Sequence, residues 1–166
     1  MFYTIYTPLI FYQLLSFIKK YSNFELKLRE YFAQKTKGIY PEFIVVFNQF
    51  IFFFVKKEYY LGSKMRLNAM RREFNKRKIL IIGIEKTLIN LLFSFFPDLN
   101  IDDIKIEINN SSGRREISVY FLFFEERGIA IGRNGDYIRA VNYIFENYVI
   151  FENNNTPLKV LCKFKR

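Results

Sequence analysis

The sequence has no histidine, a single cysteine, and only seven glycines and four prolines among its 166 residues. Without histidine, the chain lacks the commonest catalytic base and the commonest metal ligand. Cys162 excludes an internal disulfide framework, and its alternation with Val160 and Phe164 predicts a buried thiol. Nucleophile motifs and acidic clusters with metal-ligand spacing are also missing. We therefore expect no enzyme activity, no catalytic residue, no metal site and no cofactor.

Long apolar runs are scarce as well. Residues 6–18 and 43–55 are each apolar over roughly 13 positions, whereas a membrane-spanning helix needs about 20. The second run is rich in Val, Ile and Phe, which predicts a buried strand pair or one long strand. No stable membrane insertion is expected, although a membrane subunit of an organellar complex stays open as an alternative class.

Positive charge is plentiful: Lys and Arg number 26 against 16 Asp and Glu, a net charge of +10. Residues 56–78 hold nine basic residues against Glu58 and Glu73. Met65, Ala69, Met70 and Phe74 keep helical spacing there, which predicts a helix with one apolar stripe and a basic face. Such a concentration favours phosphate binding by the segment, and its predicted RNA-binding residues are Lys64, Arg66, Arg71, Arg72, Lys76, Arg77 and Lys78.

The amino-acid usage is biased toward residues that AT-rich codons specify. Phe, Tyr, Ile, Asn and Lys, which AT-rich codons specify, supply 83 of the 166 residues. We interpret the bias as drift in an AT-rich genome, with a mitochondrial gene expected and a plastid gene as the alternative; an AT-rich free-living or parasitic microbe also stays open. No secretory signal pattern is visible at the start of the chain.

Several elements can be placed from periodicity. Residues 24–38 predict a short amphipathic helix that stops at Gly38. The stretch 79–97 begins apolar and then predicts a helix that ends at Pro97. Residues 104–108 and 116–124 alternate around a turn of Asn, Ser and Gly, which predicts a hairpin with Phe121 and Phe123 facing inward.

A glycine turn dominates the last third of the chain. Gly132, Arg133, Asn134 and Gly135 stand between a short helix over 125–131 and a longer one that follows. Neither a dinucleotide fingerprint nor a P-loop has this spacing. Glycines at such a corner let backbone amides approach a phosphate, and the start of the following helix adds attraction. The alternative is a helix–helix corner without any RNA contact.

The stretch "IAIGRNGDYIRAVNYIF" resembles the KH signature, and the surrounding order of elements is similar to the type II (prokaryotic) KH domain. The resemblance covers about residues 84–165. It implies RNA binding through the four residues of the turn, with Arg139 added to the RNA-binding set. It also implies that Ile129 and Ile131 before the turn, and Ile138 and Val141 after it, form the core and one wall of a groove for bases.

Two kinds of KH protein are similar. The first is the KH-containing small-subunit ribosomal protein, which implies ribosomal RNA and neighbouring ribosomal proteins as partners. That protein normally continues into a further domain, so a second polypeptide supplying it is expected. The second is the NusA-type transcription factor, which carries two KH copies; a second G-x-x-G is absent here.

Taken together, these elements predict an α+β fold. Residues 1–78 are expected to form an N-terminal α/β extension that carries the basic helix. Residues 79–166 are expected to form a type II KH domain in the order helix, strand, strand, helix, G-x-x-G, helix, strand. The expected function is that of an RNA-binding structural constituent of an organellar small ribosomal subunit, with a NusA-like factor as the alternative.

Overall fold

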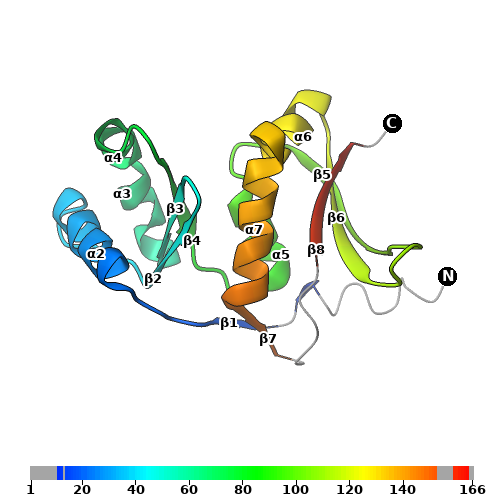
Figure 1. Cartoon of the computed structure of the whole chain (residues 1–166), viewed down its shortest axis with the longest axis horizontal. Coiled ribbons are helices and arrows are strands. Elements are labelled where there is room, and N and C mark those ends of the chain that lie inside the picture. Colours follow the sequence, from blue (N-terminus) through cyan, green and yellow to red (C-terminus); the bar gives the residue numbers. More distant parts are fainter. Residues whose placement is uncertain (1–10, 13, 153–158, 165–166) are drawn as a thin grey trace. The chain divides into compact units, whose positions relative to one another are not determined.

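The computed structural model describes residues 11–12, 14–152 and 159–164. The chain folds into two compact units: an N-terminal unit, Ile18–Glu85, and a C-terminal unit made of Met1–Phe17 with Lys86–Arg166. Helices and strands mix in both units (Figure 1), so the predicted α+β class is confirmed. Within the described residues, no helix is both long enough and apolar enough to cross a membrane.

The N-terminal unit is a three-stranded sheet with helices on one side (Figure 1). Its elements are α2 (Asn23–Lys35), β2 (Phe43–Phe47), β3 (Phe50–Val55), a 3-10 turn (Lys57–Tyr59), α3 (Tyr60–Lys64), α4 (Leu67–Glu73) and β4 (Lys78–Gly83). The strand order is β2-β3-β4, with β2 antiparallel to β3 and β3 parallel to β4. The run 43–55 is therefore a strand pair.

Local signals explain the ends of these elements. Ser22 and Glu25 form a capping box at the start of α2, which satisfies two backbone amides. At the other end the Gly38 N–H donates to the Ala33 carbonyl with φ at +101°, so the predicted glycine stop is confirmed. The β2–β3 hairpin turns at Asn48, whose φ is +50°.

The core of this unit lies between α2, α4 and the helix-covered face of the sheet. Leu28 and Phe32 of α2 meet Ile51 and Phe53 of β3, with Met70 of α4 in the same cluster. The Phe32 and Phe53 ring centroids are 4.5 Å apart. Burying several large apolar side chains at about 1.5–3 kcal/mol each supplies the driving force for this unit.

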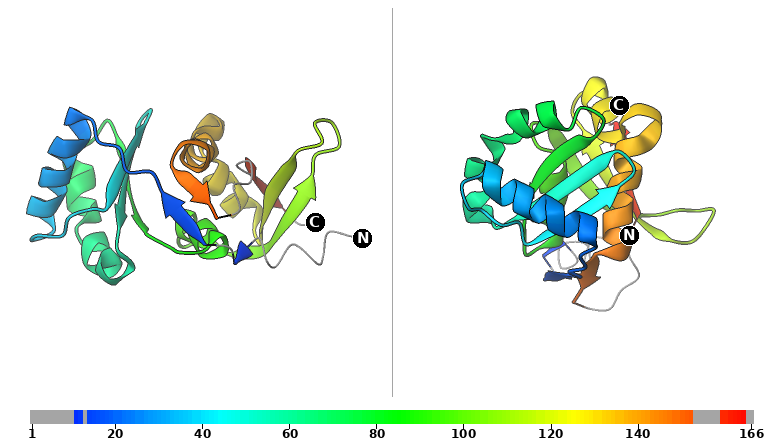
Figure 2. Two further views of the ribbon diagram at one scale, coloured as in Figure 1. Left: turned by 90° about the horizontal axis from the view of Figure 1, so that it is seen from below. Right: turned by 60° about the vertical axis from the view of Figure 1, so that its left-hand side comes forward.

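The C-terminal unit contains α5 (Leu88–Phe95), β5 (Ile101–Ile108), β6 (Arg115–Phe121), α6 (Phe124–Ile131), α7 (Asp136–Asn147), β7 (Val149–Phe151) and β8 (Lys159–Phe164). Strand order is β5-β6-β8, antiparallel and then parallel, and β1 (Leu15–Phe17) pairs with β7. The β5–β6 hairpin tip projects away from the helices of its unit (Figure 2). The predicted hairpin is confirmed, and the order of elements after it matches the prediction except for β7, which stands between α7 and β8.

Side chains from α5, α7 and the sheet fill the core of the C-terminal unit. Phe95 lies 5.7 Å from Phe145 between ring centroids, and Phe96 lies 5.5 Å from Phe121. Cys162 is buried as predicted, and burial raises the pKa of its thiol to about 12. A thiol held neutral in this way is a core residue with little nucleophilic character.

The two units repeat one topology. Apart from the separate β1–β7 pair, each runs helix, strand, strand, helix, helix, strand, and in each the last strand adds parallel to the middle one. The registers also correspond, because Ile79 pairs with Ile51 in one unit and Val160 pairs with Ile117 in the other. The N-terminal part of the chain is therefore a second α+β unit of the same plan.

Three details differ from the sequence prediction. The units divide between Glu85 and Lys86 instead of between 78 and 79, because β4 pairs along its whole length with β3. The basic segment forms two short helices that break at Met65 and Arg66, where the Arg66 N–H donates to the Ser63 carbonyl. Phe123 is 51% exposed, because β6 ends at Phe121 and Phe123 is the extended N-cap residue before α6.

The break also divides the predicted apolar stripe. Met70 is fully buried and Phe74 is half-buried, but Met65 is 83% exposed and Ala69 is exposed. A continuous helix would keep all four on one face. The corner instead turns α4 so that Leu67, Met70 and Phe74 meet the core while Ala69 faces solvent.

Candidate nucleic-acid interface

The predicted glycine turn lies at the corner between α6 and α7. Gly132 follows α6 with φ +82° and ψ 171°, a region that only glycine occupies readily. Asn134 has φ +55° and Gly135 has φ +73°. Three left-handed residues within four positions make a tight reversal that places α7 directly after it.

Gly132 also has no room for a side chain. A Cβ built at this position would lie 2.1 Å from Asp136 Oδ1 and 2.8 Å from the Tyr137 backbone nitrogen. The first turn of α7 therefore packs directly on the backbone of the loop. This close approach is between two parts of the chain itself, whereas the approach expected from the sequence is that of a phosphate to the backbone amides.

The side chains of the turn are arranged for contact with solvent or a ligand. Arg133 and Asn134 are both exposed. Arg139, one turn into α7, donates from Nη1 to the Asn134 carbonyl at 2.6 Å. Arg139 was predicted to bind RNA, and its observed contact is to the loop itself, which it holds in shape.

The electrostatics of the corner are mixed. Arg133 and Arg139 bring two positive charges, while Asp136 occupies the first turn of α7. A carboxylate at this position favours the helix but opposes an incoming phosphate. The start of α7 is therefore less attractive to a phosphate than the glycine turn alone predicts, because Asp136 stands there.

The apolar residues that flank the turn divide into two groups. Val141 is fully buried, and Ile131 and Ile138 are half-buried. Ile129 is 63% exposed, so it is not a core residue; α6 directs it to solvent while Ala130 faces inward. An exposed isoleucine beside the turn is still compatible with contact to a base.

The basic segment lies wholly in the N-terminal unit. Lys64 and Arg66 flank the corner between α3 and α4, and the Lys64 ammonium lies 5.9 Å from the Tyr60 ring centroid. Arg72 and Lys76 are exposed. Arg71 and Arg77 each donate to a main-chain carbonyl, and the Lys78 ammonium lies 5.5 Å from the Phe50 ring centroid. These seven residues therefore differ in how firmly they are held.

Sequence reasoning missed a polar cluster on the sheet of the C-terminal unit. Glu107 of β5 accepts hydrogen bonds from Ser118 at 2.6 Å, from Tyr120 at 2.5 Å and from Lys163 at 2.5 Å. Burial raises the pKa of Glu107, but these three donors outweigh it and lower the pKa to about 2. The hydrogen bond to Glu107, together with burial, raises the pKa of Tyr120 to about 12. A carboxylate this acidic is a structural anion and a poor general base at neutral pH.

A hollow of about 330 Å³ lies beside that cluster. It is lined by Tyr120, Phe124, Arg127, Lys163 and Phe164. The Lys163 ammonium forms an ion pair with Glu107, and Arg127 donates from Nε to the Cys162 carbonyl at 3.3 Å. No sequence signal combined these residues, because they come from two strands and the start of α6.

Comparison with known proteins adds one structural likeness. No protein-family model and no curated protein matches the sequence. Among solved structures, the chain described as the crystal structure of APE1850 is similar, with a TM-score of 0.58 and 14% identity. The match covers 87% of this chain and 100% of that chain. At this identity the likeness shows the α+β fold, and it extends over both units.

Proposed function

We propose that this protein binds RNA, with the turn Gly132–Gly135 holding the sugar-phosphate backbone. The observation that carries the proposal is the geometry of that corner. The left-handed backbone presents the exposed side chains of Arg133 and Asn134 to a phosphate, while the Gly132 and Gly135 amides donate to the Gly128 and Gly132 carbonyls and hold the turn. The KH resemblance of the same residues, and the net charge of +10, support the same partner.

The repeated topology favours one kind of RNA-binding protein over another. A NusA-type factor carries two KH copies, and two units of one topology are present here. The corner between α3 and α4 has no G-x-x-G, so its unit would be a copy that kept the shape and replaced the loop. A small-subunit ribosomal protein of an organelle remains the second candidate, on the resemblance described above.

A pair of matched variants tests the RNA contact. Arg133→Asp with Asn134→Asp places two carboxylates at the turn, and we expect affinity for single-stranded RNA to fall by at least about tenfold. Asn110→Asp with Arg114→Asp makes the same chemical change at the exposed tip of the β5–β6 hairpin of the same unit. Fluorescence anisotropy compares the two. Equal losses would mean that overall charge, not the corner, attracts RNA.

Sedimentation separates the two candidates. In a sucrose gradient of the source organelle or cell, a ribosomal protein follows the small-subunit peak. A NusA-type factor is absent from that peak and co-purifies with transcribing RNA polymerase. Co-sedimentation with the small subunit after a high-salt wash would overturn the preference for a NusA-type factor.

A further inference from the structure

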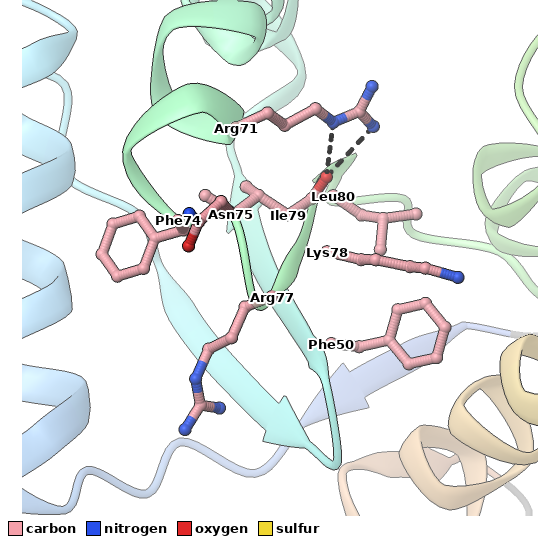
Figure 3. A pocket seen from close by; sticks show the side chains of 8 residues that line it. All are labelled: Phe50, Arg71, Phe74, Asn75, Arg77, Lys78, Ile79 and Leu80. Carbon is pink, nitrogen blue, oxygen red and sulfur yellow. Dashed lines mark hydrogen bonds between the residues drawn. The ribbon is translucent and has the colours of Figure 1, made fainter.

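A second hollow lies in the N-terminal unit, where α4 ends and β4 begins. It has a volume of about 290 Å³ and is lined by Phe50, Arg71, Phe74, Asn75, Arg77, Lys78, Ile79 and Leu80. Figure 3 shows Arg71 and Arg77 at its two ends, with Lys78 and Leu80 along one side and Phe74 and Asn75 along the other. The lining has three cations, one amide and an apolar remainder, and it has no carboxylate.

Both arginines are held in place by main-chain carbonyls. Arg71 donates from Nε and Nη2 to the Ile79 carbonyl at 3.2 and 3.1 Å (Figure 3). Arg77 donates from Nη1 to the Asn48 carbonyl at 3.4 Å, and its guanidinium lies 5.3 Å from the Phe24 ring centroid. A guanidinium has five N–H donors, so each arginine keeps several for a ligand. Because they are already ordered, they lose little side-chain entropy on binding.

The carboxylate of Glu73, next to the hollow in sequence, is bound by side chains of α2. Glu73 accepts hydrogen bonds from Lys35 and from Tyr31, each at 2.5 Å, on the α2 side of the unit. Hydrogen bonds from Lys35 and then Tyr31 lower the pKa of Glu73, so it stays ionised there. The positive potential of the hollow is therefore not cancelled by this neighbour.

In the C-terminal unit, a neutral side chain makes the hydrogen bond to the edge strand that Arg71 makes to Ile79. At the corresponding position of β8, Val160 is bound by a neutral side chain, Asn142 of α7. The Val160 N–H donates to Asn142 Oδ1 at 2.7 Å, and Asn142 Nδ2 donates to the Val160 carbonyl at 3.0 Å. An amide suffices to cover the strand edge in that unit. An arginine there adds a charge and unused donors.

We propose that this hollow binds a nucleotide segment of single-stranded RNA, with Arg71 and Arg77 on phosphates and the base over Leu80. The choice of RNA as the partner rests on the proposed function. The site itself is separate from the α3–α4 corner, because it lies at the other end of α4. Its volume is at the small end of ligand pockets, which suits one nucleotide better than a folded partner. Guanidinium forks match phosphate oxygens in geometry.

Matched substitutions on one helix test the site. Arg71→Gln removes a lining charge but keeps an amide donor near Ile79, and Arg72→Gln removes the same charge one residue away outside the lining. We expect Arg71→Gln to weaken binding of a fluorescein-labelled dodecauridylate about tenfold. Its salt slope should fall by about 0.7, the value for one phosphate on a single strand. Arg72→Gln should change the affinity much less and leave the slope nearly intact.

A second pair and a second probe complete the test. Arg77→Gln against the exposed Lys76→Gln repeats the comparison if Arg71→Gln lowers stability in urea unfolding. Inorganic polyphosphate should compete weakly, because it offers no base to the apolar side. Equal effects within both pairs, or equal binding of polyphosphate, would overturn the site. A loss in Arg71→Gln with no effect of the turn variants would keep the site and overturn the role of Gly132–Gly135; absence of any RNA binding would overturn both.

Discussion

The corners between the paired helices differ sharply between the two units. In the C-terminal unit, α6 and α7 are joined through Gly132, Asn134 and Gly135 in left-handed conformations. In the N-terminal unit, α3 and α4 are joined through Met65 at φ −60° and Arg66 at φ −97°, both in the ordinary right-handed region. The same topology therefore has a glycine corner in one unit and a corner without glycine in the other.

This difference bears on what the glycines do. If the topology itself demanded a glycine corner, the N-terminal unit would need one too. Its corner instead uses helical residues and the buried Ser63, whose hydroxyl donates to the Tyr59 carbonyl at 2.8 Å. The left-handed turn of the C-terminal unit is therefore a local choice, and a local choice of strained backbone points to function.

The largest expected effect comes from Gly132→Ala. Its Cβ would meet Asp136 Oδ1 and the Tyr137 backbone nitrogen, and the backbone there is in a region that alanine avoids. We expect a loss of about 3 kcal/mol in the free energy of unfolding. Urea unfolding followed by circular dichroism measures it.

Gly128→Ala is the matched control for that change. Gly128 lies within α6, and a Cβ there would meet nothing within 4 Å. Alanine should stabilise the helix by about 0.5–1 kcal/mol. If both variants behaved alike, the close packing at Gly132 would not be the cause, and the contrast between the corners would lose its physical basis.

Much of this contrast can be predicted from the sequence, and the reasons are local. The glycine turn, the strand pair over 43–55 and the helix stop at Gly38 are all encoded within a few residues, and all three are observed. The break at Met65 and Arg66 has no such signal. Helical periodicity continues across it, and only the burial of Met70 and Ser63 in the folded unit decides the turn.

Long-range pairing explains the other differences. β4 belongs to the N-terminal unit because it adds parallel to β3, a partner more than 20 residues earlier. The predicted boundary at residue 79 places β4 in the second unit, and the repeated order of elements is not visible with that boundary. The Arg71 contact and the Glu107 cluster also depend on strand register, so composition indicated their charge but not their partners.

A smaller loss of stability is expected when either of two glutamates, Glu107 or Glu73, is replaced. Each of them accepts hydrogen bonds from a lysine and a tyrosine. Glu107 of the C-terminal unit has a pKa of about 2, against an ordinary value of 4.5. Because the folded pKa is depressed, its contribution is complete above about pH 4.5 and is lost as the pH falls toward 2. Glu107→Gln should lower the free energy of unfolding at pH 7 by about 1–2 kcal/mol, after allowance for solvent screening.

The pH dependence identifies the cause of that loss. The difference between wild type and Glu107→Gln should shrink when urea unfolding is repeated near pH 2.5. Glu73→Gln, in the more exposed N-terminal cluster, should cost less at pH 7, because solvent screens its pair with Lys35. A Glu107→Gln loss that is independent of pH would show that packing, not ionisation, holds the cluster together.

The smallest expected effect tests whether the α3–α4 corner of the N-terminal unit needs a glycine nearby. Gly62 lies inside α3, three residues before the break, and a Cβ there would make only an ordinary 3.8 Å contact with Ile39 Cδ1. Gly62→Ala should therefore stabilise the protein by about 0.5 kcal/mol through helix propensity. Its affinity for RNA should not change. A rise in the urea midpoint of this size would agree with a corner built from right-handed residues. A loss above about 1 kcal/mol would instead mean that Gly62 serves the α3–α4 corner as Gly132 serves the other, and the two units would then differ in sequence but not in the way they turn.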